Sequence, residues 1–289
     1  MRRVLELSLV VATLVLPVSA CGGSDGGGTA GGVQSAPPRE RVAAAARATT
    51  DAGTSKLSFS ATVTVPSEGK RKEAQLTGEG EFDYEARRGR LTYELGDLLE
   101  AEGQPGNGDA EVVFDRTVFY LRFPKLAESL PDGKEWVRLD LRKLGEMQGV
   151  DLAQLSQLNQ DPSQLLDYLR ATSSEIEEVG EEEVRGDSAT HYRARIDLDK
   201  VPAQVPEDVR AVVRVSVDAL KRQLGSSSLP VDVWIDGEGR VRRLRQAIAA
   251  QGSNVELTME FYDFGADVDV EPPPEDETVD VAEFLGGDR

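Results

Sequence analysis

Polar and apolar side chains alternate one by one between residues 229 and 265, and this is the clearest pattern in the chain. Val231, Val233 and Ile235 alternate with two aspartates and a tryptophan, and the run Asp-Gly-Glu-Gly follows at 236–239. Glycine tolerates the positive φ that tight hairpin turns require. Period-two alternation turns one face of a strand toward an apolar layer and the other toward water. We therefore predict three consecutive antiparallel strands in this stretch.

The first half of the chain shows the same alternation. Gly78 and Gly80 stand inside one of these stretches, and a glycine within a strand marks a bend or a close approach of a neighbour. Short strands joined by turns form an antiparallel meander, which curls because each strand twists. The predicted strands cover residues 57–65, 76–84, 91–95, 112–123 as a hairpin, 136–141, 176–183 as an acidic edge, and 190–198.

Apolar residues at helical spacing predict several helices. The strongest covers residues 206–224, with acidic residues in its first turn, Lys221 and Arg222 in its last, and Gly225 after it, an order that complements the helix dipole. Another helix is predicted at 39–53. Two leucine-rich helices, one around residues 152–158 and one over 161–169, fit either a core or a lid over an apolar cavity. The face shared within 206–224 consists of Val209, Val212, Val213, Val217, Leu220 and Leu224.

Residues 1–20 have the form of an export signal. Arg2 and Arg3 precede an apolar run that is too short to span a bilayer. The segment leads into Val-Ser-Ala-Cys at 18–21, which resembles the lipobox of bacterial lipoproteins, and the single cysteine of the chain stands at the acceptor position. The resemblance implies cleavage before Cys21 and attachment of diacylglycerol to its thiol. The protein is then expected on the extracytoplasmic face of the cell membrane, held by its lipid.

Composition divides the remaining chain into three parts. Residues 21–38 hold the acceptor cysteine and a glycine-rich tether, which behaves as a flexible coil. Residues 39–266 carry the predicted strands and helices and form the folded domain. Residues 267–289 are an acidic, proline-containing tail, which we expect to be extended, with 279–285 able to dock back on the domain.

Charge and residue usage argue against several classes of function. The formal net charge of −19 disfavours binding to nucleic acid, where basic residues neutralise phosphates. One cysteine and one histidine leave no internal disulfide and no Cys/His zinc site. We expect no metal, no cofactor and no catalytic residues, hence a protein that is not an enzyme. His191 is interpreted as a surface or turn-bracing residue. Arginines within 240–245 are interpreted as partners of nearby carboxylates on a solvated face, with contact to an anionic headgroup or partner as the alternative.

Three local signatures carry a resemblance to a known family. They cover residues 186–198, 229–244 and 259–270, the last one before a run of prolines. Together with the lipobox and the order of helices and strands, they resemble the LppX/LprG-like lipoproteins of actinobacteria, within the LolA-like superfamily of periplasmic lipoprotein and lipid carriers. The resemblance extends over residues 39–284.

What the resemblance implies is an α+β fold, in which helices pack on the concave side of a strongly curved antiparallel sheet, a half-barrel. An apolar cavity between sheet and helices would hold acyl chains such as palmitate. No ligand-binding motif carries over from the family, so the candidates come from the apolar faces of the predicted strands. For each of them ordinary core packing is the competing interpretation. The candidates are Leu57, Phe59, Val63, Leu76, Phe82, Leu91, Tyr93, Phe119, Leu121, Leu139, Leu257 and Met259.

Three hypotheses of function follow. The first is a membrane-anchored lipoprotein that binds or carries lipid, lipoglycan or acylated cargo, with an envelope protein as a further partner. The second is a protein-interaction or sensory lipoprotein whose hollow is filled by its own side chains. The third is an envelope hydrolase, which would have to act through His191. A large apolar cavity would separate the first hypothesis from the second.

Overall fold

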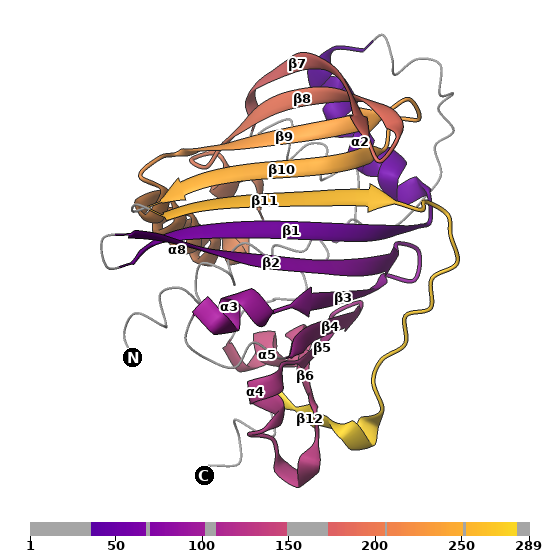
Figure 1. Cartoon of the computed structure of the whole chain (residues 1–289), viewed down its shortest axis with the longest axis vertical. Coiled ribbons are helices and arrows are strands. Elements are labelled where there is room, and N and C mark those ends of the chain that lie inside the picture. The colour runs from indigo at the N-terminus through magenta and orange to yellow at the C-terminus, as the bar shows by residue number, and fades with distance from the viewer. Residues whose placement is uncertain are drawn as a thin grey trace.

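One curved sheet organises the part of the chain that the computed structural model describes, residues 36–67, 70–101, 108–148, 173–205, 207–250 and 253–281 (Figure 1). In these residues the sheet has 12 strands, and all neighbours pair antiparallel except the last strand in sequence. The strands of the first half are β1 Thr54–Ser67, β2 Lys70–Asp83, β3 Arg88–Glu94, β4 Asp109–Asp115, β5 Val118–Arg122 and β6 Trp136–Asp140. The others are β7 Ser173–Val184, β8 Asp187–Asp197, β9 Ser228–Asp236, β10 Val241–Ala250, β11 Ser253–Tyr262 and β12 Thr278–Asp280.

Two meanders meet in the middle of the sheet. The strand order is β12-β6-β5-β4-β3-β2-β1-β11-β10-β9-β8-β7, so the first strand pairs with the eleventh. The register of that pairing matches apolar positions on both strands, for example Leu57 with Phe261 and Phe59 with Met259. The three consecutive strands predicted from 229–265 are confirmed as β9, β10 and β11. The predicted acidic edge is also confirmed, since β7 is an end strand of the sheet.

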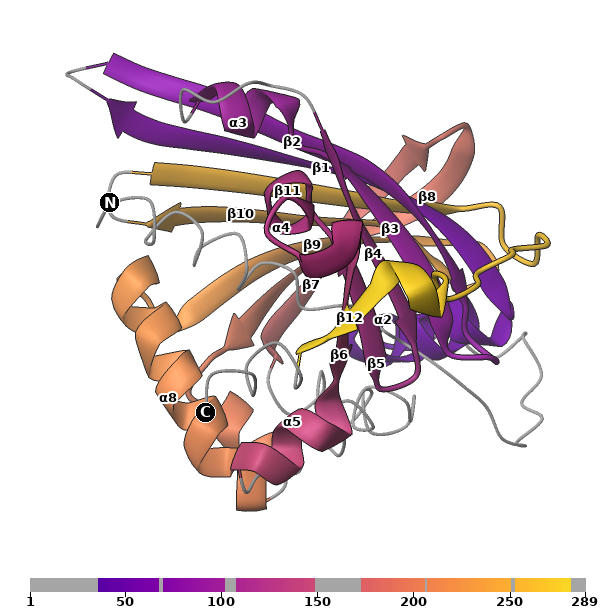
Figure 2. The same ribbon diagram turned by 90° about the horizontal axis from the view of Figure 1, so that it is seen from below.

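The two longest helices of the described residues, α2 and α8, lie on the concave side of the sheet (Figure 2). The N-terminal helix α2, Pro38–Asp51, buries Val42 and Ala45 against Tyr192 and Val233 of the sheet. Gly53 follows α2 with a φ of 80°, as expected of a residue that ends a helix. The predicted helix 206–224 is α8, Glu207–Leu224, and Gly225 after it also has a positive φ, 65°. Shorter helices are α3 Gly96–Ala101, α4 Pro124–Ala127, α5 Leu141–Gln148, η1 Pro131–Gly133, η2 Val201–Gln204 and η3 Glu275–Glu277.

Helix α8 packs less completely than its apolar stripe predicts. Val217 is buried against Leu198 and Val201, whereas Val212, which we expected on the same buried face, is 46% exposed. Val215 is 67% exposed. The helix therefore packs through one line of side chains, which contacts η2 and the ends of β8 and β9. The side chain of Val209 and the leucine-rich helices predicted within 152–169 lie outside the described residues.

Strand β6 ends one residue earlier than predicted, because helix α5 begins at Leu141. Leu141 was expected to continue the strand that contains Val137 and Leu139, but it begins α5 instead. Asp140 explains the change, because its Oδ1 accepts a hydrogen bond from the backbone N–H of Arg142 at 3.0 Å. An aspartate that satisfies a free N–H of the first turn favours the start of a helix.

The segment after β11 runs down one side of the molecule to the far edge of the sheet, where it forms η3 and β12 (Figure 1). Val270 packs against Val113 and Trp136. β12 then pairs parallel with β6, Val279 opposite Val137, and Arg138 binds Asp280 at 2.8 Å. The expectation that the tail docks back is met by residues 278–281, while 282–289 lie outside the described residues.

Candidate functional site

All twelve candidate residues lie on one face of the sheet. Residues that pair directly across neighbouring strands share a face, and the pairing links the candidates from strand to strand. The series extends from β6, where Leu139 pairs with Phe119, to β11, where Leu257 pairs with Ala61. This face, called the apolar face below, turns toward the concave side, since Leu244 of β10 packs both against it and against the cluster beneath α2.

The apolar face is formed by one large hydrophobic cluster. Every candidate except Val63, Leu121 and Leu139 belongs to it or packs against it. The cluster also contains Tyr84, Phe114 and Phe261, which are not among the twelve candidates. The alternation along 255–261 could have indicated Phe261, because it continues the series that contains Leu257 and Met259.

Glycines leave room for side chains that lie across the sheet, as the sequence predicted for Gly78 and Gly80. A Cβ added at Gly78 would overlap the ring of Phe59, and one added at Gly80 would lie 2.5 Å from Leu91 Cδ2. Gly89 accommodates the ring of Phe114 in the same way. These large side chains therefore lie over the backbone of their neighbours, and the apolar face is continuous where a glycine interrupts the row of side chains.

Aromatic rings extend the apolar face from β1 to β5. The ring centroids of Phe59 and Tyr93 are 5.0 Å apart, and those of Phe114 and Phe119 are 6.0 Å apart, both in tilted arrangements. Burial raises the pKa of Tyr93 to about 12. The phenol is therefore neutral throughout the physiological pH range, and it adds no charge to this surface.

The candidates fall into two groups by exposure. Leu57, Leu76 and Phe82 are almost fully buried, and so are Val63, Leu91 and Tyr93. The second group is partly exposed although its members are large and apolar. This group could contact a ligand without unpacking the core, and it consists of Phe59, Phe119, Leu121, Leu139, Leu257 and Met259.

A cavity of about 450 Å³ lies away from the apolar face, between η2 and α8. It therefore occupies a different place from the cavity that the family resemblance implies. Its size falls within the usual range of ligand sites. Its lining is mixed, with four apolar and four charged residues: Leu198, Asp199, Pro202, Ala203, Arg210, Arg214, Val217 and Asp218.

The arginines at 240–245 are paired with carboxylates, as the sequence predicted. Arg243 binds Glu260 at 2.7 Å, and Arg245 binds Glu256 at 2.8 Å. Arg240 binds both Asp236 and Glu238. The expectation of a solvated face holds less well for Arg242, which is only 7% exposed and binds Asp187. This local excess of basic residues is neutralised within the protein itself.

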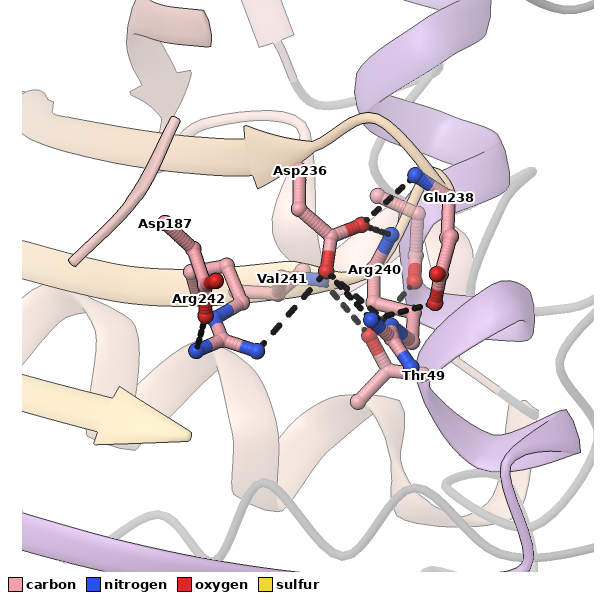
Figure 3. Close-up of polar contacts among 8 residues, drawn as sticks. Thr49, Asp187, Asp236, Glu238, Arg240, Val241 and Arg242 are labelled. Atoms are coloured by element: carbon pink, nitrogen blue, oxygen red, sulfur yellow. Dashed lines mark hydrogen bonds and ion pairs between the residues drawn. The ribbon is translucent and has the colours of Figure 1, made fainter. Parts of the chain in front are cut away.

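Asp236 holds the β9–β10 turn together (Figure 3). Its carboxylate accepts hydrogen bonds from the backbone N–H groups of Glu238, at 3.0 Å, and Arg240, at 2.9 Å. The next N–H, that of Val241, donates to Thr49 Oγ1 of α2 at 2.8 Å. These contacts join the turn to the N-terminal helix, so the arrangement stabilises the fold.

His191 is buried on the convex face, which corrects the expectation of a surface position. It is 5% exposed and stacks on Trp234, with ring centroids 4.2 Å apart. Its Nδ1 lies 3.0 Å from Glu182 Oε1, and its Nε2 lies 2.7 Å from Asp232 Oδ1. The ring thus connects β7, β8 and β9, which agrees with the predicted bracing role.

Glu260 of β11 links its strand to β10 and to the β7–β8 turn on the convex face, and it gives a pH-dependent contribution to stability. Burial raises its pKa, but hydrogen bonds from Arg243 and Arg185 outweigh that effect and hold it below the ordinary value of 4.5. A carboxyl whose pKa is lowered by folding stabilises the native state above its unfolded pKa, and the contribution is lost as the pH falls through the folded pKa.

We therefore expect Glu260→Gln to flatten the pH dependence of stability. The free energy of unfolding of the natural protein should fall as the pH drops below the ordinary glutamate pKa of 4.5, and that of the variant should fall less steeply, because its amide does not titrate. Urea unfolding at a series of pH values measures this. Glu256→Gln is the matched control, because Glu256 lies on the same strand and binds Arg245 alone in an exposed pair. Equal slopes in the natural protein and Glu260→Gln would contradict the assignment.

The described residues contain no cluster of potential metal ligands and no helix that could span a membrane. Within them, no group of three or more His, Cys, Asp or Glu side chains is arranged to hold a metal ion. None of the helices in the same part of the chain is both long and apolar enough to cross a membrane.

Comparison with known proteins gives a likeness of fold. No family model matches the chain. An uncharacterized 31.2 kDa protein from the rplA–rplJ intergenic region of Streptomyces griseus is 27% identical over 196 residues, which are 66% of this chain and 62% of that protein. The chain thus spans less than two thirds of the length of this relative.

Among solved structures, the lipoprotein LppX of Mycobacterium tuberculosis is 14% identical, with 80% of this chain and 99% of that one covered at a TM-score of 0.42. LprF of Mycobacterium bovis is 13% identical, with 82% and 96% covered at a TM-score of 0.39. A LolA superfamily protein of Nitrosomonas europaea is 8% identical, with 83% and 96% covered at 0.29.

Proteins of the LppX type and of the LolA superfamily are thus among the solved structures to which the chain is similar. The likeness concerns the fold. The function has to be argued from the residues of this chain.

Proposed function

We propose that this protein is a membrane-anchored extracytoplasmic lipoprotein that binds or carries lipid, lipoglycan or acylated cargo on its apolar face. The observation that supports this most directly is the row of large, partly exposed apolar side chains on the concave side of the sheet. Phe59 and Met259 pair at the centre of the sheet, and Phe119 and Leu139 continue the row toward one edge. An extended surface of this kind suits an acyl chain.

Removal of acyl surface from water supplies the free energy of binding. Each CH₂ group that leaves water contributes about 0.8 kcal/mol. The opposite face of the same strands carries polar side chains, for example Ser58 and Ser60 on β1 and Glu260 on β11. The acyl chain would therefore lie on one side of the sheet only. The apolar face would select ligands by the length of the acyl chain rather than by the headgroup.

The anchor in this proposal rests on Cys21. We expect Cys21→Ser to move the protein from the membrane fraction to the soluble fraction, because its thiol is the acceptor of diacylglycerol, and two acyl chains bind a bilayer far more tightly than one. Cell fractionation, together with metabolic labelling by radioactive palmitate, measures this. The labelled band should disappear in the variant. Label and membrane association that persist in Cys21→Ser would show that the anchor lies elsewhere.

Native mass spectrometry of the Cys21→Ser chain tests the lipid-binding function itself. This chain lacks the anchoring thiol, so any acyl mass that it carries is bound without a covalent link. The proposal predicts a fraction of protein with lipid bound after purification, and uptake of a fluorescent fatty acid by the delipidated protein. A chain that purifies without lipid and takes up no fatty acid would overturn the proposal.

The second candidate is a protein-interaction or sensory lipoprotein with a filled hollow. The near-complete burial of Leu57, Leu76 and Phe82 favours it to this extent, since side chains of the protein itself already cover these positions of the apolar face. The same experiment separates the two functions, because a filled hollow takes up no fatty acid. Neither candidate involves catalysis.

A further inference from the structure

The cavity between η2 and α8 has the make-up of a binding site for a small amphiphilic anion. Its floor is apolar, with Leu198, Pro202 and Val217 buried. Two arginines of α8, Arg210 and Arg214, line it from one side. They are four residues apart, so their side chains lie on the same face of the helix, one turn from each other.

These two arginines differ from those at 240–245 in having no carboxylate partner within the described residues. Arg210 donates one long hydrogen bond, of 3.4 Å, to the carbonyl of Val205, and Arg214 has no ion pair in that part of the chain. The arginines of β10, in contrast, all contact carboxylates. In a chain with a net charge of −19, a neighbouring pair of guanidinium groups beside a cavity, without a carboxylate partner in the described part of the chain, is unusual.

Two carboxylates share the lining and limit what the cavity accepts. Asp199 accepts a hydrogen bond from Lys221, and this contact raises the pKa of the lysine. Asp218 lies on α8 four residues after Arg214, without an ion pair to it. The lining therefore does not attract anions indiscriminately. It favours a single compact anion held by the two arginines, with the carboxylates at its border.

We propose that this cavity, the α8 pocket, binds a phosphate ester through Arg210 and Arg214, with the adjoining carbon skeleton on the apolar floor. The planar guanidinium group binds phosphate oxygens in pairs, and two such groups one helical turn apart suit a tetrahedral oxyanion. The phosphate could belong to a lipid headgroup or to a free phosphate ester. The proposal rests on the proposed function only for the first of these sources.

Calorimetric titration of the full chain with glycerol 3-phosphate tests the site, with glycerol as the negative control. We expect Arg210→Gln and Arg214→Gln each to weaken binding about tenfold, and the double variant by more, because each removes a charge-assisted contact. Arg214→Lys should bind more tightly than Arg214→Gln but less tightly than the natural protein, since lysine keeps the charge but lacks the paired N–H donors of the planar guanidinium group. Arg222→Gln is the matched control, for Arg222 is an exposed arginine of α8 outside the lining. It should change affinity less than twofold.

Flotation with phosphatidylglycerol and with phosphatidylcholine vesicles identifies the source of the phosphate. Vesicle binding that depends on Arg210 and Arg214 indicates a lipid headgroup, whereas glycerol 3-phosphate binding without vesicle binding indicates a free ester. Either result supports the pocket. Absence of binding to every phosphate probe would overturn it, and so would equal weakening by Arg222→Gln. Fatty-acid uptake by the same variants should be unchanged, so failure of the pocket is distinguishable from failure of the apolar face.

Discussion

Replacing Leu257 with Asp is expected to weaken the uptake of a fluorescent fatty acid at least about tenfold, because a carboxylate on the apolar face must lose water when an acyl chain covers it. Leu257 is partly exposed and lies opposite Ala61 on β1. It touches the main cluster without being enclosed by it. The substitution therefore acts on the ligand surface and leaves the fully buried part of the core in place. Fluorescence titration of the delipidated Cys21→Ser chain measures the effect.

Thr258→Asp is the matched control for this variant. Thr258 is the next residue of β11, also partly exposed, and its side chain points to the convex face, where it lies beside Ser60 and Arg245. The same charge is thus introduced one residue away on the other side of the sheet. Its uptake should match that of the natural protein, and thermal unfolding should confirm that both variants are folded. Equal uptake by both variants would mean that acyl chains do not bind on the apolar face.

Replacing Gly78 with Ala is expected to lower the free energy of unfolding by about 2–3 kcal/mol, although the same change usually stabilises a strand. The usual gain is about 0.4–1 kcal/mol, from a smaller entropy of the unfolded chain. At Gly78 the added methyl group would overlap both the ring of Phe59 and the backbone carbonyl of Thr92. Overpacking of this kind costs about 1–3 kcal/mol or more, so the loss outweighs the gain.

Urea unfolding of Gly78→Ala beside Gly237→Ala isolates the effect of the close contact. A Cβ at Gly237 would meet nothing within 4 Å, so that variant should differ from the natural protein by less than about 0.5 kcal/mol. Because Phe59 is a candidate ligand contact, Gly78→Ala should also weaken fatty-acid uptake. A neutral or stabilising Gly78→Ala would show that the ring of Phe59 does not lie across this glycine.

The individual strands could be predicted from the sequence because period-two alternation is a local property. Residues 57–65 and 255–261 each show it clearly. The pairing of β1 with β11 is not local, since Lys56 lies opposite Tyr262, and nothing within either strand selects the other as its neighbour. The single curved sheet was expected from the family resemblance, and the register that places all twelve candidates on one face required the structure.

Short elements and crossing segments escaped prediction for a different reason. β12 has three residues, too few for a periodic pattern, and it is held by Lys143 and Arg138 through Asp280. Val270 is buried because the tail crosses the sheet beside Trp136, a contact between distant parts of the sequence. The start of α5 did have a local signal in the sequence. Asp140 stands directly before Leu141, and an aspartate at that place can cap a helix.

The α8 pocket shows that a basic cluster in the sequence does not reveal which arginines are available to a ligand. The cluster at 240–245 is the conspicuous basic feature of the sequence, and the structure neutralises it. Arg210 and Arg214 are inconspicuous within a helix that also carries acidic residues. Only the position of carboxylates in space distinguishes a paired arginine from an available one, so the pocket could not have been found from spacing alone.

Photoaffinity labelling with a diazirine-bearing fatty acid tests the central claim most directly. The delipidated Cys21→Ser chain is irradiated with the bound probe, and the labelled residues are identified by peptide mass spectrometry. The account predicts labels on the apolar face, at or beside Phe59, Leu257 and Met259, and competition by unlabelled fatty acid. Labels confined to the convex face around Trp234 and Tyr262, or labelling that unlabelled fatty acid does not reduce, would contradict it.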